Sequence, residues 1–242
     1  MIVGGLRKDG VMTDYELSSV KKVIGTHVKK AAELSCYLRE HPELPDQEFE
    51  SSRKMVEILK EAGFEVTYPF AGYETAFHAL FDNGDGPEVA ILAEYDALPE
   101  IGHGCGHNLL GCGSLAAAVA LKEYMEAHNL SGSVCYYGCP GEEKGCGKMH
   151  MAEAGCFREL DAALTWHPQD YNGVDGRTSL ADLCMKFTFT GQSAHAASCP
   201  HLGRSALDAL ELLNIACNFM REHVIPEARI HYAITDAGGE AP

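Results

Sequence analysis

Three short apolar runs, separated by helical patterns, constrain the fold of this chain more than any other feature. The runs lie in EVAILA (88–93), GSVCYYGCP (132–140) and DAALTWHP (161–168). Apolar runs of this length, bounded by glycine or proline, are typical of strands with both faces covered. Helical patterns over about 108–127 and 148–157 separate them. This alternation predicts an α/β fold with a mainly parallel central sheet flanked by helices.

The chain before these runs contributes two helices and two short strands. Apolar residues at helical spacing predict helices over 16–40 and about 47–62, with two prolines between them. Segments of strand type follow at FEVTYPF (64–70) and TAFHALF (75–81). We therefore expect the sheet to continue beyond its three most apolar strands.

After about residue 181 the pattern changes. The segments DLCMKFTFTGQ (182–192) and ARIHYAITDAG (228–238) read as strands, and a strongly amphipathic helix is expected within 200–223. We expect one domain over residues 1–181 and part of a second, smaller α+β domain over 182–242. The second part has too few strands to close a sheet of its own.

The composition excludes several classes of function. The formal net charge is −16, whereas nucleic-acid binding needs a basic surface, and an anionic membrane is an equally unsuitable partner. No apolar run is long enough to span a bilayer, and the N-terminal residues 1–10 lack a secretory pattern. We expect a cytoplasmic protein, in which the ten cysteines are mostly buried thiols or metal ligands rather than disulfides.

Polar side chains of metal-ligand type follow all three apolar runs. Two of them belong to the glycine-rich loop EIGHGCGHNLLG after the first run, and two are the adjacent glutamates of GCPGEEKG after the second. The candidates are Asp96, Cys105, His107, Glu142, Glu143 and His167. Because the carboxyl ends of parallel strands meet at one edge of a sheet, we expect these groups to converge in one crevice, where open α/β sheets bind ligands.

The residue types at this edge favour a divalent metal. Cysteine, histidine and glutamate all bind zinc-like ions, and the glycines allow the Cys105-x-His107 segment to fold tightly. Two adjacent glutamates can divide the work, one binding the metal and the other taking a proton from a water whose pKa the metal lowers to roughly 7. Asp96 can accept a hydrogen bond from a ligand histidine and fix its tautomer.

Each element also has a simpler interpretation. The glycine loop could cradle a dinucleotide, but Gly104-x-Gly106-x-x-Leu109 lacks the third glycine and no acidic residue follows at the required distance. Taken singly, the cysteine is a buried thiol, the glutamate pair a solvated turn, and His167 a strand-end histidine. Their placement at successive strand ends favours the metal site.

Two residues of the second domain are further candidates. His195 lies in the small-residue loop GQSAHAAS, where its ring can approach a ligand closely; the alternative is a helix-capping loop with an incidental histidine. Arg204 could bind a carboxylate through two hydrogen bonds, and is otherwise an ordinary surface arginine.

The motifs EYDALPEIGHGCGHNLLG, GCPGEEKG, LTWHP and GQSAHAA resemble the aminoacylase-like metallopeptidases of family 20, in particular the amidohydrolases that act on N-acyl amino acids. The resemblance covers nearly the whole chain, in order. It implies a zinc-peptidase-like catalytic domain over 1–181 and part of a lid and dimerisation domain over 182–242.

The resemblance also implies roles for the candidate residues around two divalent ions, zinc or manganese. The implied ligands are Cys105, His107, Glu143 and His167, with Cys105 as a candidate bridge. Glu142 is the implied general base and Asp96 orients a ligand. His195 stabilises the oxyanion in a neighbouring subunit's site, and Arg204 is our candidate partner for the substrate carboxylate.

The expected activity is hydrolysis of an N-acyl amino acid, with an acyl-glutamate as the expected substrate. A dipeptidase of the same family and a non-catalytic metal-binding or partner subunit are the alternatives. The family implies a homodimer, or a heterodimer with an A-type subunit, formed through the lid. Family members supply a last histidine ligand after the lid, so this chain is expected to be a truncated form that binds fewer than two ions tightly.

Overall fold

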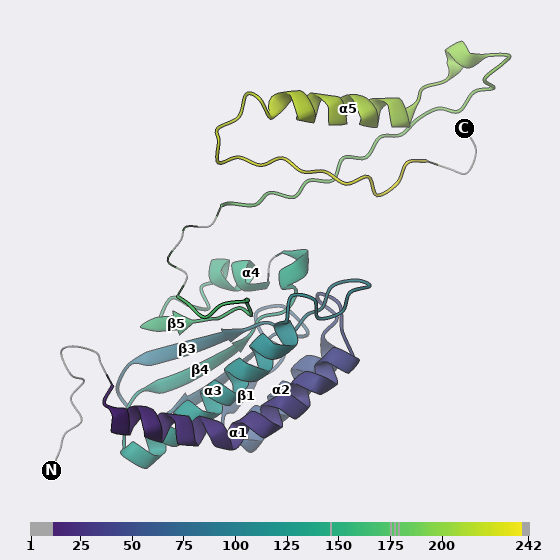
Figure 1. Cartoon of the computed structure of the whole chain (residues 1–242). Coiled ribbons are helices and arrows are strands. Elements are labelled where there is room, and N and C mark those ends of the chain that lie inside the picture. Colours follow the sequence, from purple (N-terminus) through teal and green to yellow (C-terminus); the bar gives the residue numbers. More distant parts are fainter. Residues whose placement is uncertain (1–11, 146, 175, 177, 179, 239–242) are drawn as a thin grey trace. The chain divides into compact units, whose positions relative to one another are not determined.

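The structure is a computed structural model that describes residues 12–145, 147–174, 176, 178 and 180–238 (Figure 1). The N-terminal residues 1–10, which lack a secretory pattern, and Cys146 lie outside the described residues. The chain divides into two compact units, Met1–Asn172 and Gly173–Pro242, a boundary that lies before the predicted one at residue 181.

The first unit is built on a five-stranded sheet with the order β1-β2-β4-β3-β5. Its strands are β1 (Glu65–Thr67), β2 (Phe77–Asp82), β3 (Glu88–Ala93), β4 (Ser133–Gly138) and β5 (Ala162–Leu164). β3 pairs in parallel with both β4 and β5, whereas β2 pairs antiparallel with β1 and β4. The predicted α/β class is confirmed, and β2 alone runs against the common direction of the other strands.

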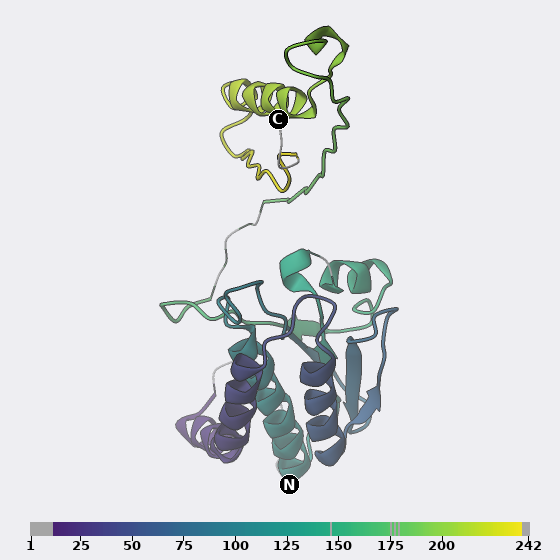
Figure 2. The same ribbon diagram turned by 90° about the vertical axis from the view of Figure 1, so that its right-hand side faces the viewer.

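Three long helices cover one face of this sheet, namely α1 (Asp14–Glu40), α2 (Phe49–Glu61) and α3 (His107–His128) (Figures 1 and 2). Side chains along β4 point alternately to the two faces of the sheet. Val134 and Tyr136 join the core beneath the helices, while Cys135 and Tyr137 pack on the other face with Met151 of α4 (Gly147–Glu153). Both faces of the central strands are therefore buried, as their apolar composition predicts.

The second unit contains the predicted amphipathic helix but not the predicted strands. Helix α5 (Ala206–Met220) is capped by Ser205, whose hydroxyl accepts the Asp208 N–H at 3.0 Å. The two segments predicted as strands, 182–192 and 228–238, form no paired strand among the described residues; one isolated bridge joins Gln192 to Arg204. These two predictions are wrong because an alternating pattern forms a strand only where a neighbour takes its backbone hydrogen bonds.

The sequence has no apolar run long enough to span a bilayer. Within the described residues, no helix combines the length and the apolarity needed to cross a bilayer.

Candidate metal centre

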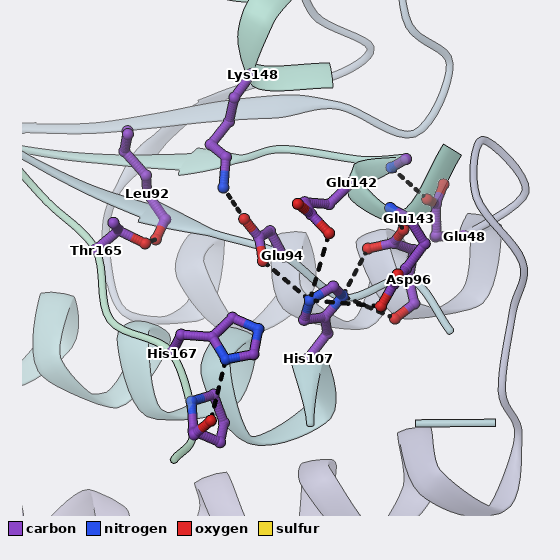
Figure 3. A network of polar contacts seen from close by, with 12 residues as sticks. Glu48, Leu92, Glu94, Asp96, His107, Glu142, Glu143, Lys148, Thr165 and His167 are labelled. Atoms are coloured by element: carbon purple, nitrogen blue, oxygen red, sulfur yellow. Dashed lines mark hydrogen bonds and ion pairs between the residues drawn. The ribbon is translucent and has the colours of Figure 1, made fainter. Parts of the chain in front are cut away.

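The candidate site lies at the carboxyl edge of the parallel strands. β3, β4 and β5 run in the same direction, and the chain leaving them carries Asp96, the Glu142–Glu143 pair and His167, respectively. His107 is the first residue of α3 and points into the same space (Figure 3). The structure thus brings together groups that the sequence places at three separate strand ends.

His107 is held in one orientation by Asp96. The imidazole has no exposed surface, and its Nδ1 lies 2.9 Å from Asp96 Oδ1. Because Asp96 offers a carboxylate, Nδ1 is the donor and Nε2 keeps its lone pair in the neutral ring. The other oxygen, Asp96 Oδ2, accepts the Glu143 N–H at 2.9 Å. One buried carboxylate therefore positions both the histidine and the backbone of a glutamate.

Three carboxylates surround the free nitrogen of this histidine. His107 Nε2 lies 3.1 Å from Glu94 Oε2, 3.9 Å from Glu142 Oε2 and 4.0 Å from Glu143 Oε1. Among the described residues, Nε2, Glu94 Oε2 and Glu143 Oε1 are buried without a hydrogen-bond partner. Burying such groups unpaired is costly. A cation at this point satisfies all three atoms, and the donor set suits a divalent metal ion.

Two groups of three side chains can hold such an ion. Cys105, His107 and Glu143 form one, and Glu94, His107 and His167 form the other; in each the ligand atoms lie within 4.8 Å of one another. The rings of His107 and His167 are nearly perpendicular, with centroids 5.5 Å apart. All the ligands implied by the sequence thus gather around His107.

Glu94 is a member of the site that the sequence analysis did not single out. It follows β3 directly and precedes Asp96 by two residues, so the strand-end argument applied to Asp96 applies to it equally. Its other oxygen, Oε1, forms an ion pair with Lys148 of α4 (Figure 3). Burial lowers the pKa of the Lys148 ammonium to about 8, while the ion pair favours its charged form.

The acidic surroundings shift the titration of the candidate ligands. Burial by itself lowers the pKa of His107, but the hydrogen bond to Asp96 and the nearby glutamates outweigh it and raise that pKa. The hydrogen bond with Glu143, then burial and the charges nearby, raise the pKa of the Cys105 thiol to about 11. Burial also raises the pKa of Glu142. Without a cation the Cys105 thiol therefore keeps its proton at neutral pH, and a metal ion that binds its sulfur displaces that proton.

A buried carboxylate far away in the sequence fixes the backbone before the glutamate pair. Glu48 has no exposed surface, and it accepts hydrogen bonds from the Gly141 N–H at 2.8 Å and the Thr75 hydroxyl at 2.8 Å. Gly141 has a φ of +66° and immediately precedes Glu142. The left-handed turn favours glycine, and Glu48 ties that turn to the start of α2.

Glycine is also required at position 106, in the loop that carries Cys105. Gly106 has a φ of +81°, and a Cβ added there would lie 3.0 Å from the Pro168 ring. This close approach brings the loop of Cys105 beside the segment that carries His167.

His195 and Arg204 lie in the second unit. His195 Nδ1 accepts the N–H groups of Ala197 and Ser198, both at 3.2 Å. The Arg204 guanidinium donates to the carbonyl oxygens of Gly203 at 2.6 Å and His201 at 3.2 Å. Within its unit Arg204 therefore stabilises its own loop.

The fold and this cluster are those of an α/β protein whose cysteine, histidine and carboxylate side chains could hold a metal ion at the carboxyl edge of the sheet. Residues 90–235 match the profile described as Peptidase family M20/M25/M40. The chain belongs to this family.

Known relatives agree with this assignment. The chain is 46% identical over 220 residues to the B subunit of p-aminobenzoyl-glutamate hydrolase from Escherichia coli (strain K12), covering 84% of this chain and 46% of that protein. It is 32% identical to the Xaa-Arg dipeptidase of Mus musculus, covering 95% and 56%. Among solved structures, the Bacillus subtilis YXEP protein, described as a dinuclear metal-binding peptidase of the M20 family, is 27% identical with a TM-score of 0.50, covering 57% of this chain and 42% of that chain. The chain spans about half the length of these curated relatives.

Proposed function

We propose that this chain is part of a metal-dependent amidohydrolase that cleaves the amide bond of an N-acyl amino acid, specifically p-aminobenzoyl-glutamate. The observation that carries the proposal is the His107 Nε2 atom, oriented by Asp96 and surrounded by unpaired carboxylate oxygens. The 46% identity to one of the chains of a p-aminobenzoyl-glutamate hydrolase supports the substrate class.

In this proposal two divalent ions, zinc or manganese, are held by Cys105, His107, Glu143 and His167. Such ions polarise the amide carbonyl and lower the pKa of a water molecule. The dinuclear character of the YXEP protein supports the count of two. Asp96 keeps His107 in the tautomer that presents Nε2 to the metal, as its 2.9 Å hydrogen bond allows.

Glu142 is the proposed general base. Its side chain is 46% exposed, against 15% for Glu143, and its Oε2 lies 3.9 Å from His107 Nε2. A partly accessible carboxylate beside the metal position can take the proton of the attacking water and return it to the leaving amine. Burial raises the pKa of Glu142, which brings it closer to the range suited to proton transfer.

Residues 1–181 form the catalytic part in this proposal, and 182–242 belong to a lid and dimerisation domain. His195 serves the developing oxyanion and Arg204 the substrate carboxylate. The partner is a second copy or an A-type subunit. The designation of the Escherichia coli relative as a B subunit supports the A-type partner. The described cysteines are all free, which supports a cytoplasmic location. In this proposal a folate-derived substrate is broken down there.

The similarity to an Xaa-Arg dipeptidase, at 32% identity, makes dipeptide hydrolysis the activity to test against this proposal. The two activities differ in the group that follows the cleaved bond, glutamate in one and arginine in the other. Parallel assays of p-aminobenzoyl-glutamate and an Xaa-Arg dipeptide separate them. Faster hydrolysis of the dipeptide would replace our proposal with the dipeptidase.

The roles of the adjacent glutamates are tested by a matched pair of variants. Glu142→Gln should keep the bound metal and reduce turnover about 10²–10⁴-fold, the usual contribution of a general base. Glu143→Gln should instead lower the metal content. Metal analysis and hydrolysis of p-aminobenzoyl-glutamate with added zinc or manganese measure both.

Equal metal loss in the two variants would show that the roles are assigned wrongly. A wild-type protein that binds metal but hydrolyses neither acyl amino acids nor dipeptides would favour the non-catalytic alternative.

A further inference from the structure

We propose that Glu94 is an additional metal ligand of this centre and that Lys148 is the positioning residue that orients it. The inference rests on the proposed function, because it adds a ligand to the same metal centre. None of the family motifs quoted above assigns a role to either residue.

The burial and direction of Glu94 are the first observation. Its side chain is 5% exposed, and Oε2 has no hydrogen-bond partner among the described residues. This oxygen faces His107 Nε2 at 3.1 Å (Figure 3). A zinc ion lies about 2.0–2.2 Å from each of its ligand atoms. An oxygen 3.1 Å from Nε2 therefore lies within the same metal centre and can bind a second ion beside the one that Nε2 binds.

The number of lone pairs is the second observation. A histidine Nε2 has one lone pair and binds one ion, yet His107 belongs to both candidate ligand groups. If it joins Cys105 and Glu143, then Glu94 and His167 are left as the pair that holds a second ion nearby. Two-metal sites place their ions about 3.5–4 Å apart, which suits ligand atoms gathered within 4.8 Å in each group.

Lys148 explains why only one oxygen of Glu94 faces the metal position. Its ammonium, carried by α4, forms an ion pair with Oε1 and leaves Oε2 directed at His107. The contact joins an element on one face of the sheet to the end of β3. It fixes the carboxylate rotamer and adds positive charge beside several acidic groups. Outer partners of this kind typically change metal affinity 10–100-fold when removed.

Calorimetric titration of the metal-free protein with Zn²⁺ and with Mn²⁺ tests the assignment. Glu94→Gln should lower the affinity for the ion held by Glu94 and His167 at least ~10-fold. Lys148→Met should lower the affinity for the same ion about 10-fold. Lys148→Arg should restore most of the affinity because the charge is kept. The matched control is Lys144→Met, which removes an exposed ion pair with Asp46, 3.0 Å long, on the neighbouring loop; it should leave both affinities unchanged.

Titration with Co²⁺ gives a second readout, since an ion bound to the Cys105 thiolate produces a sulfur-to-metal charge-transfer band. Glu94→Gln and Lys148→Met should keep this band while losing affinity for the other ion. Unchanged titrations in both variants would overturn the role of Glu94 while leaving the proposed function intact. Equal loss in Lys148→Met and Lys148→Arg would overturn the positioning role of Lys148. A wild-type protein that binds no divalent ion would overturn both the proposed function and this inference.

Discussion

The two units of this chain treat their apolar residues differently. In the first unit Leu38, Met55 and Leu59 have no exposed surface, because helices and sheet cover one another. In the second unit no described residue is buried, and Leu212 and Phe219 of α5 are 67% and 70% exposed. Both units contain well-formed helices, so helix formation alone does not account for the difference.

The difference shows that an apolar helix face becomes a core only when a second layer meets it. α3 packs against α1 and on β3 and β4, whereas α5 has a capped N-terminus but no sheet beside it among the described residues of its own unit. We therefore expect the first unit to carry the stability of the chain and the metal centre. The following predictions test this division, from the largest effect to the smallest.

The largest contrast is expected between two leucine truncations. Leu59→Ala removes a fully buried side chain of α2 and should lower the free energy of unfolding by ~2–5 kcal/mol, the cost of a core cavity. Leu212→Ala in α5 should change it by less than ~0.5 kcal/mol, because that side chain is exposed.

Urea titration followed by Trp166 fluorescence measures both variants. Trp166 is the single tryptophan of the chain, and its Nε1 donates to Ser114 Oγ at 3.2 Å within the first unit. A loss above ~2 kcal/mol in Leu212→Ala, the size expected of a core truncation, would break the comparison, because α5 would then be part of a core.

A smaller effect is expected for two variants of the second unit, which should change the kinetics with substrate but not the metal content. Arg204→Ala should raise KM for an acyl-glutamate about 10-fold, equivalent to ~1.4 kcal/mol, and raise it less for an acyl-alanine. His195→Ala should lower kcat for both substrates. Neither variant should change metal content, since both residues lie in the second unit. Steady-state kinetics with the two substrates and metal analysis test this, and an equal KM effect on both substrates would return Arg204 to a structural role.

The smallest effect is a pH dependence within the first unit. The pKa of His107 is raised above its ordinary value, so the stabilisation from its protonated ring is complete below that value, roughly 6.5, and is lost as pH rises through the raised pKa. The metal-free protein should lose stability as pH rises through this range, and Glu142, whose pKa is also raised, contributes with the same sign.

Metal binding displaces these protons, so metal affinity should rise over the same pH interval. Trp166-monitored unfolding with and without zinc, across the interval around the ordinary histidine pKa of roughly 6.5 and above it, measures both trends. In Asp96→Asn the raised pKa of His107 loses its main support, and the pH dependence of the metal-free protein should shrink. An unchanged pH profile in that variant would contradict the role given to Asp96.

Much of the first unit and its site could be read from local patterns. The apolar runs, the helical spacing and the glycine loop are short-range properties, and they placed β3, α3 and β4 close to their observed positions. Once the strands are parallel, their carboxyl ends must share an edge. For this reason His107 and His167 could be predicted as neighbours before any contact was known.

Other features depend on which elements become neighbours, and a periodic pattern does not specify neighbours. Glu48 reaches Gly141 across 93 positions of the sequence, and Lys148 finds Glu94 because α4 packs on the sheet. The segments 182–192 and 228–238 alternate like strands, yet they remain unpaired in the described structure. In the first unit, the sequence by itself determined the strands, the helices and the residue types at the sheet edge. Only the tertiary structure decided which buried carboxylates were satisfied, because hydrogen bonds and ion pairs between distant segments depend on packing and register.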